Sequence, residues 1–161
     1  MEFDTNPFPK ADGDRHALWE MLVRRDIDAF LARDWSMVEA DFLAEEFFGL
    51  HAHLMTNPDS WRLQFPTLDA YRDEWLRQAG ETAAQGFAEP LRPALFRAMQ
   101  MRDIDIAGTR AVLHKKFDGT IARTGGGEVR LKWQTLYFCR RVDGRWRIQG
   151  FTGYLPHPLG A

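Results

Sequence analysis

Cysteine is nearly absent from this 161-residue chain, in which Cys139 is the single thiol. One cysteine excludes an intramolecular disulfide and a cysteine-based zinc site. Serine is equally scarce: Ser36 and Ser60 are the only two, and neither lies in a G-x-S-x-G motif, so a nucleophilic serine of that type is not expected. No stretch approaches the ~20 apolar residues that a membrane span needs, so no membrane association is expected.

The N-terminal segment also lacks features. Its first residues, Met-Glu-Phe-Asp-Thr-Asn-Pro, have neither the basic nor the apolar region of a secretory signal. Together with the single cysteine, this favours a reducing, cytoplasmic compartment. Residues 1–13 contain two prolines and Gly13, and we expect a flexible arm there.

Apolar residues, in contrast, are plentiful. Hydrophobic residues make up 45% of the chain and aromatic residues 13%, which excludes disorder and fits one folded domain. Charge is unevenly distributed: residues 1–90 hold 8 Lys/Arg against 18 Asp/Glu, whereas residues 91–161 hold 13 against 5. We interpret this as an acidic helical layer packed on a basic sheet. The acidic layer would repel a polyanion, so nucleic acid is not an expected partner.

Hydrophobic periodicity predicts three helices, followed by a sheet. The helices are 15–32 with Asp14 as N-cap, 36–43 with a Ser36/Glu39 capping box, and 68–78 between the cap Thr67 and a stop at Gly80. A strand is expected at 47–55 and a loop at 56–66. Further strands are expected at 96–106, 111–117, 129–142 and 145–154, the last two joined by an Asp143-Gly144 hairpin.

These elements predict an α+β fold with three N-terminal helices packed on one face of a curved, mostly antiparallel sheet. One domain is expected over residues 14–155, with a tail at 156–161. The strand 129–142 is apolar on both faces, with Leu136 and Phe138 opposite Trp133 and Tyr137. Helices on one side only would leave the second face in water. We therefore expect a homodimer formed through the outer sheet face.

One carboxylate falls within the apolar stripe of the first predicted helix. At 100° per residue, Asp26 lies within about 40° of both Trp19 and Phe30. A charge in such a stripe must be paired, protonated or directed into a pocket, because burying it alone costs several kcal/mol. A desolvated carboxyl group suits acid–base catalysis. The alternative is a structural carboxylate bonded to a backbone N–H, an arginine or a Trp indole.

Two histidines form an H-x-H pattern, which puts the imidazoles of His51 and His53 on one face of a strand. Alternation places them opposite the apolar Phe48 and Leu50, so they point away from the helices if that apolar face is packed. A β-bulge near Gly49 would reverse this phase. The carboxylate that would complete a zinc or iron site is missing, and neither a metal nor a cofactor is expected.

The order helix, short helix, strand, helix and long meander resembles the nuclear transport factor 2-like superfamily. That group includes SnoaL-like polyketide cyclases, ketosteroid isomerases, scytalone dehydratase and limonene epoxide hydrolase. Residues 32–46, with an acidic pair at Glu45-Glu46, are similar to its helix–turn–helix before the first strand, and residues 138–150 are similar to its closing hairpin. The resemblance covers residues 14–155 and implies a cone-shaped fold with an apolar pocket between sheet and helices.

The resemblance also suggests roles for individual residues. His51 falls where ketosteroid isomerases carry a catalytic carboxylate, so steroid isomerisation is not expected. Scytalone dehydratase is the closer analogy, because an aspartate on its first helix and strand histidines serve its pocket. Asp26, His51 and His114 are therefore the candidate catalytic residues.

The expected ligand is a small apolar molecule, bound mainly by aromatic side chains. The candidate ligand-binding residues are Trp19, Trp35, His53, Trp61, Tyr71, Trp133 and Tyr137; core packing is the alternative for each aromatic. Two functions stay open at this stage. One is a lyase, isomerase or hydrolase that uses Asp–His acid–base catalysis, and the other is a non-catalytic ligand-binding or dimeric interaction module.

Overall fold

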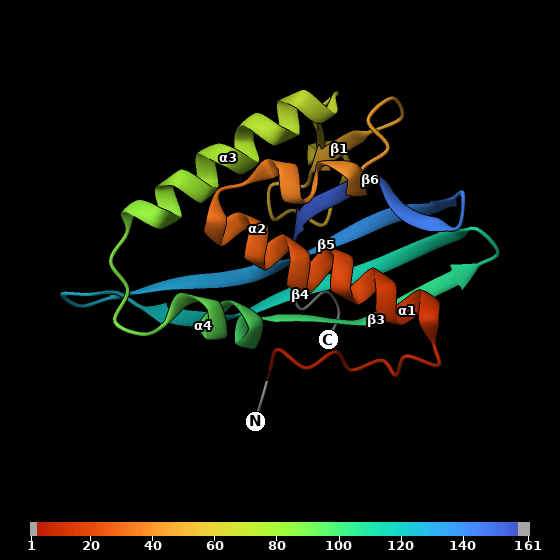
Figure 1. The fold of residues 1–161 in the computed structure, drawn as a ribbon. Helices are drawn as coiled ribbons and strands as arrows, with labels where there is room; N and C mark the ends of the chain where they lie inside the picture. The colour runs from red at the N-terminus through yellow and green to blue at the C-terminus, as the bar shows by residue number, and fades with distance from the viewer. Residues whose placement is uncertain (1–2, 158–161) are drawn as a thin grey trace.

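The computed structural model describes residues 3–157 and begins with one continuous helix whose type changes along its length (Figure 1). Its parts are α1 (Gly13–Trp19), the π-helical η1 (Glu20–Arg25) and α2 (Asp26–Ala32). The N-cap is Asp12, whose carboxylate accepts from the Arg15 N–H. The expected cap, Asp14, lies in the first turn and accepts from the Trp146 indole at 2.9 Å, which joins this helix to the sheet.

The prediction of a second helix is wrong. The segment forms two 3₁₀ turns, η2 (Trp35–Met37) and η3 (Glu39–Asp41). Asp34 caps the first of them by accepting from the Ser36 N–H at 3.0 Å. Asp41 is buried and accepts from the guanidinium groups of Arg25 and Arg145. These contacts from two distant elements hold the segment as turns.

Two further helices differ from the sequence prediction in extent. α3 (Leu68–Ala84) begins at the expected cap, Thr67, but continues beyond Gly80, because one glycine costs a helix only about 1 kcal/mol. α4 (Leu91–Ala98) occupies the start of the segment expected to be a strand. Pro93 lies in the first turn of α4, where a missing N–H is tolerated.

Six strands form one sheet in the order β2-β1-β6-β5-β4-β3. They are β1 (Phe48–His51), β2 (Arg62–Phe65), β3 (Met99–Ala107), β4 (Arg110–Ala122), β5 (Glu128–Val142) and β6 (Arg145–Leu155). β2 lies where a loop is expected, at the sheet edge and mostly exposed. β1 and β6 pair in parallel, and the other described pairs are antiparallel. Asp143 and Gly144 both have positive φ, as the expected two-residue hairpin requires.

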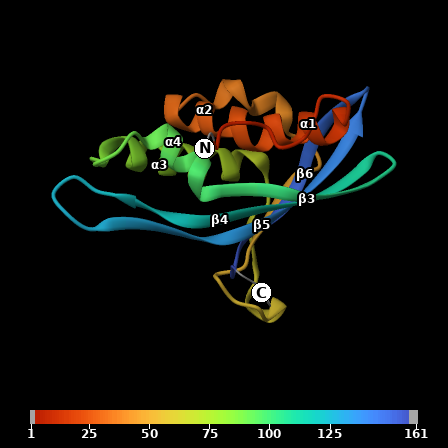
Figure 2. The same cartoon turned by 90° about the horizontal axis from the view of Figure 1, so that it is seen from below.

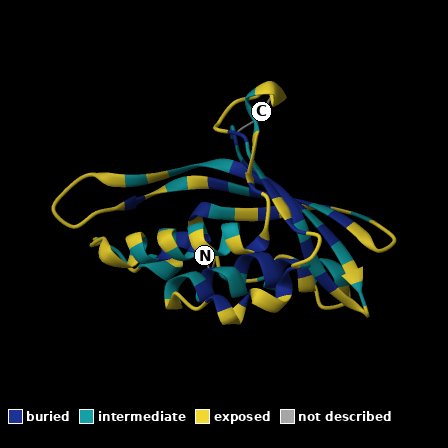
Figure 3. Ribbon diagram, turned by 90° about the horizontal axis from the view of Figure 1, so that it is seen from above, coloured by how far each residue is buried: buried dark blue, intermediate teal, exposed yellow. Residues whose placement is uncertain are grey.

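The helices and the sheet form two layers. Figure 2 shows the helices on one side of the sheet, while the β1–β2 connection and the end of β6 project beyond the other side. Buried residues lie between the layers, and exposed residues mark the hairpin tips (Figure 3). The α+β prediction is therefore confirmed, with a curved, mostly antiparallel sheet.

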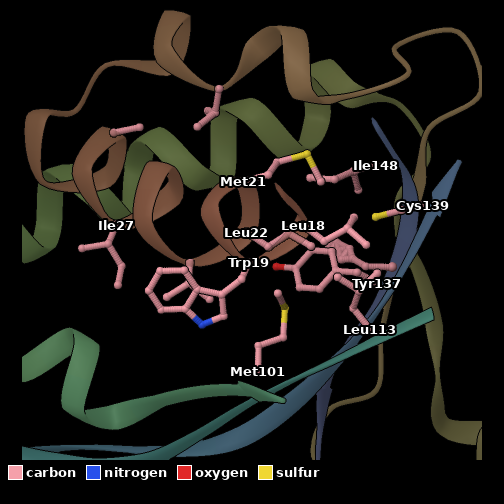
Figure 4. Packing of buried hydrophobic residues seen from close by; sticks show 14 of the residues in the cluster. Leu18, Trp19, Met21, Leu22, Ile27, Met101, Leu113, Tyr137, Cys139 and Ile148 are labelled. Atoms are coloured by element: carbon pink, nitrogen blue, oxygen red, sulfur yellow. The ribbon is translucent and has the colours of Figure 1, made fainter. Parts of the chain in front are cut away.

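The core lies between the first helix and the middle of the sheet. Leu18, Leu22, Leu113 and Cys139 are at most 2% exposed and meet there (Figure 4). The segment that the sequence predicts to be a flexible arm lies along this helix. There the Asn6 amide donates to the His16 carbonyl at 3.0 Å.

Candidate functional site

A cavity of about 260 Å³ lies between the helical layer and the sheet. Its floor is formed by the inward-facing side chains of β4 and β5, and its other walls come from α2, α3, α4 and β6. The volume is just below the roughly 300–1,000 Å³ of drug-sized ligand sites, which favours a small molecule.

The floor changes character along the two central strands. The innermost cross-strand pair of the floor is polar, with Lys115 opposite Thr135. The next inward pair is aromatic, and the rings of Phe117 and Trp133 stack at 4.5 Å. Aliphatic Leu131 follows. The cavity thus has a polar inner end and a largely apolar outer end.

Asp26 forms the centre of the polar end. Its Oδ1 accepts from the Trp75 indole at 3.3 Å, and its Oδ2 accepts from the Lys115 ammonium at 3.0 Å. Lys115 also donates to the carbonyl of Leu22, at 2.5 Å. Leu22 lies in the π-helical segment, a departure from regular α-helix that is often found at functional sites.

The two charges differ in their access to solvent. The Lys115 side chain is 1% exposed, whereas that of Asp26 is 30% exposed. A buried ammonium needs an anionic partner, which Asp26 supplies. The carboxylate in turn remains accessible from the cavity, which it lines. Asp26 can therefore accept a further hydrogen bond from a bound molecule.

Two tyrosines complete the polar end. Tyr71 and Tyr137 both line the cavity. Burial raises the pKa of each phenol well above its ordinary value, and the nearby Asp26 charge adds to the effect. Both hydroxyls therefore stay protonated at neutral pH and can donate hydrogen bonds.

One side wall is a polar stripe on α3, which consists of Glu74, Gln78, Glu81, Thr82 and Gln85. Spacings of three and four residues put most of these side chains on the same helix face. A helix packed directly on a sheet would present apolar side chains at these positions. α3 instead spans the cavity and leaves room below it.

Four of the sequence-predicted site residues line this cavity: Asp26, Tyr71, Trp133 and Tyr137. Trp19 and Trp35 lie in the core outside it, and Figure 4 shows Trp19 there. Trp19 stacks on Phe96, and Trp35 stacks on Phe42. Trp61 lies on the β1–β2 connection, and its indole donates to the Met55 carbonyl.

The structure does not bring the histidines to Asp26. His114 alternates with the inward-facing Lys115 and so faces the outer side of the sheet. His53 is exposed. His51 is half-buried and is not part of the cavity lining, but its ring stacks at 4.3 Å on Tyr154, which lines the cavity. A register irregularity lies between Gly49 and His51, at the position where a β-bulge would change the side to which the histidines point.

Sequence reasoning missed Lys115 and did not assign Trp75 as the partner of Asp26. Leu113, Lys115 and Phe117 occupy alternate positions of a strand and therefore lie on one face of it. A lysine between two apolar residues of the same face is the sequence pattern that could have identified Lys115. The indole of Trp75 is one of the partners that the structural interpretation of Asp26 named. The polar stripe on α3 was not recognised, because the predicted helix ended at Gln78 and so did not include Glu81, Thr82 and Gln85.

Metal and membrane interpretations find no support in the part of the chain that the structure describes. Across residues 3–157, no three His, Cys, Asp or Glu side chains lie close enough together to hold a metal ion. Among the same residues, no helix combines the length and apolar character needed to cross a membrane.

Comparison with solved structures identifies the architecture. A nuclear transport factor 2-like protein of unknown function from Pseudomonas putida KT2440 aligns over 91% of this chain and 87% of its own, with a TM-score of 0.57 and 17% identity. One from Shewanella baltica OS155 aligns over 91% and 96%, with a TM-score of 0.55 and 16% identity. This chain has the nuclear transport factor 2-like fold.

A third match describes the same architecture in other words. It is a nuclear transport factor 2-like protein with a cystatin-like fold from Novosphingobium aromaticivorans, aligned over 93% of this chain and 86% of its own, with a TM-score of 0.55 and 12% identity. No protein-family model and no curated protein matches the sequence. The nuclear transport factor 2-like fold explains the cone-shaped cavity, and the function must be argued from the residues that line it.

Proposed function

We propose that the protein binds a small, largely apolar molecule in the cone cavity, with a hydrogen-bond donor of that molecule directed at Asp26. The observation that carries this proposal is an accessible carboxylate at the inner end of a cavity whose floor is largely aromatic and aliphatic. Small-molecule sites typically combine apolar walls with a few fixed polar groups. Trp75 and Lys115 fix the carboxylate here, so binding needs little reorganisation.

The test uses a neutral probe with an apolar body and one hydroxyl group, 2-(2-naphthyl)ethanol. Calorimetric titration is expected to show one molecule bound per chain. Leu131→Trp fills the outer part of the cavity and is expected to weaken binding at least about tenfold, because even 1.4 kcal/mol of lost contact has that effect.

Lys132→Trp is the matched control for this substitution. Lys132 is the next residue on β5 and bonds Asp118 on the outer side of the sheet, so the same bulky side chain is added away from the cavity. Binding by this variant should equal that of the wild type. Equal binding by both variants would place the probe elsewhere and contradict the proposal.

Catalysis is the second candidate function, and a specific arrangement favours it. Asp26 is accessible beside two protonated phenols, so one group could accept a proton while another donates one to the same molecule. The reaction would be that of a lyase, isomerase or hydrolase on an apolar substrate. Tyr137 would act as the acid–base partner of Asp26, the role that the sequence analysis assigned to a histidine.

The catalytic proposal is tested with the double variant Asp26→Asn/Lys115→Met, which removes both charges of the pair together. It should fold and lose all turnover of any substrate that the wild type converts. Turnover that survives in the folded double variant would contradict the catalytic role proposed for Asp26.

A further inference from the structure

The charged side chains around the cavity are predominantly acidic. Three carboxylates line it, Asp26, Glu74 and Glu81, against one cation, Lys115. Lys115 is already engaged by Asp26 and the Leu22 carbonyl. The two glutamates share a single arginine, Arg77, which bonds both of them. A negative charge therefore remains at the α3 side of the cavity, and no cation of the described lining is free to meet an anionic ligand.

A row of aromatic rings lies next to this acidic wall. Phe117, Trp133, Tyr154 and His51 form a continuous aromatic row, with ring separations of 4.5, 5.4 and 4.3 Å along it. The row crosses four strands, and its members Phe117, Trp133 and Tyr154 line the cavity. The rings of the row stack on one another, so the row offers an apolar surface on which the body of a ligand can pack.

One hydrogen-bonded link holds the acidic wall next to the aromatic row. The Gln78 amide donates both to the Glu74 carboxylate, at 3.2 Å, and to the Tyr154 hydroxyl, at 3.0 Å. Glu74 is 29% exposed and lines the cavity, so its charge is partly desolvated but accessible. A partly desolvated carboxylate beside an apolar aromatic surface can pair with the ammonium group of a ligand whose body packs on that surface.

We propose that the ligand carries a cationic nitrogen that pairs with Glu74, while its apolar body packs on Trp133 and Tyr154. This inference rests on the proposed binding function and names the chemical class of the ligand. It is an ammonium compound with an aromatic or alicyclic body. A carboxylate or phosphate ligand would meet the acidic wall without a free positive partner.

The test compares three probes with the same apolar body: 2-(2-naphthyl)ethylamine, 2-(2-naphthyl)ethanol and 2-naphthylacetate. At pH 7.5 the first is a cation, the second is neutral and the third is an anion. The amine is expected to bind about tenfold more tightly than the alcohol, because only the amine can form an ion pair with the partly desolvated Glu74 carboxylate. The anion is expected to bind more weakly than the alcohol.

Glu74→Gln removes the charge, keeps the shape and retains an oxygen for Arg77. In this variant the preference for the amine over the alcohol should fall to about threefold or less, with alcohol affinity unchanged. Asp73→Asn is the matched control, because Asp73 is the adjacent residue on α3 and its exposed carboxylate lies outside the cavity lining. This control should keep the full preference.

The outcomes separate the two proposals. If the alcohol binds as expected but the amine binds no better, or if the anion binds best, the ammonium inference is wrong and the binding function stands. An equal loss of amine and alcohol affinity in Glu74→Gln would also overturn the inference. If none of the three probes binds, both proposals fail.

Discussion

At the scale of single residues, the Asp26–Lys115 pair is asymmetric, because one partner is almost fully buried and the other is partly open to the cavity. Asp26→Asn leaves a buried ammonium without its counter-charge, which is expected to cost about 3 kcal/mol of unfolding free energy. Lys115→Met leaves a carboxylate that water can reach and should cost about 1 kcal/mol or less. Urea denaturation of the two variants measures the difference.

The double variant Asp26→Asn/Lys115→Met is the control for this asymmetry. Replacing both charges of a buried pair is often close to neutral, so the double variant should be more stable than Asp26→Asn alone. Equal losses in the two single variants would show that the two side chains are equally solvated in solution.

His51 makes stability depend on pH. Partial burial lowers its pKa below the ordinary 6.5, and the charge of His53 adds to this, so the folded state disfavours the imidazolium. The unfolded state therefore binds more protons as the pH falls below about 6.5, and stability decreases in that direction. Urea denaturation at pH 7.5 and 6.0 should show a smaller decrease for His51→Gln than for the wild type. An unchanged decrease would contradict a role for His51.

The polar end of the cavity could be predicted from the sequence only in part. Asp26 was identifiable because helix geometry alone places it among apolar residues. Its partners come from Trp75 and Lys115, which are 49 and 89 residues away, and only tertiary packing brings them together. The side of the sheet to which His51 and His53 point depends on a local register irregularity in β1, and hydrophobic alternation alone does not predict that irregularity.

At the scale of secondary structure elements, α3 contains a replaceable glycine. A Cβ added at Gly80 would meet no atom within 4 Å, so Gly80→Ala should stabilise the protein by up to about 1 kcal/mol through helix propensity. Thermal denaturation provides the measurement. Gly119→Ala is the contrasting variant, because its Cβ would lie 2.9 Å from the Cβ of Ala98 on α4 and should destabilise the protein.

Elements with long periodic patterns were predictable, and short ones were not. β5, β6 and the first helix follow their hydrophobic patterns closely, whereas β4 continues to Ala122, five residues beyond the predicted strand. β2 carries no such pattern because it is an exposed edge strand that β1 holds by backbone pairing. The segment at Trp35–Asp41 has helical capping residues, but Asp41 is held by Arg25 and Arg145. Contacts of this kind override local propensity.

At the scale of the whole molecule, the outer sheet face carries apolar side chains without helical cover. Phe48 is 48% exposed, and the register places Phe48, Gly150, Phe138 and Val112 in one row across four strands. We propose that a second copy of the chain covers this face. Sedimentation velocity at micromolar concentration should show a dimer, and Phe138→Asp should give a monomer.

Met37→Asp is the control for the dimer. Met37 is similarly exposed, at 41%, but lies in a 3₁₀ turn away from the outer face. This variant should remain dimeric. A wild-type protein that sediments as a monomer would contradict the proposal that a second copy covers the outer sheet face.

The parallel pairing of β1 with β6 has a consequence for synthesis on the ribosome. Gly49 of β1 pairs with Phe151 of β6. About a hundred further residues must therefore be synthesised after β1 before β6 is available to pair with it. Until then β1 exposes unpaired backbone groups, which favour association with other chains. Folding of the cavity region is thus a late and nonlocal event, slower than that of a helical domain of similar length.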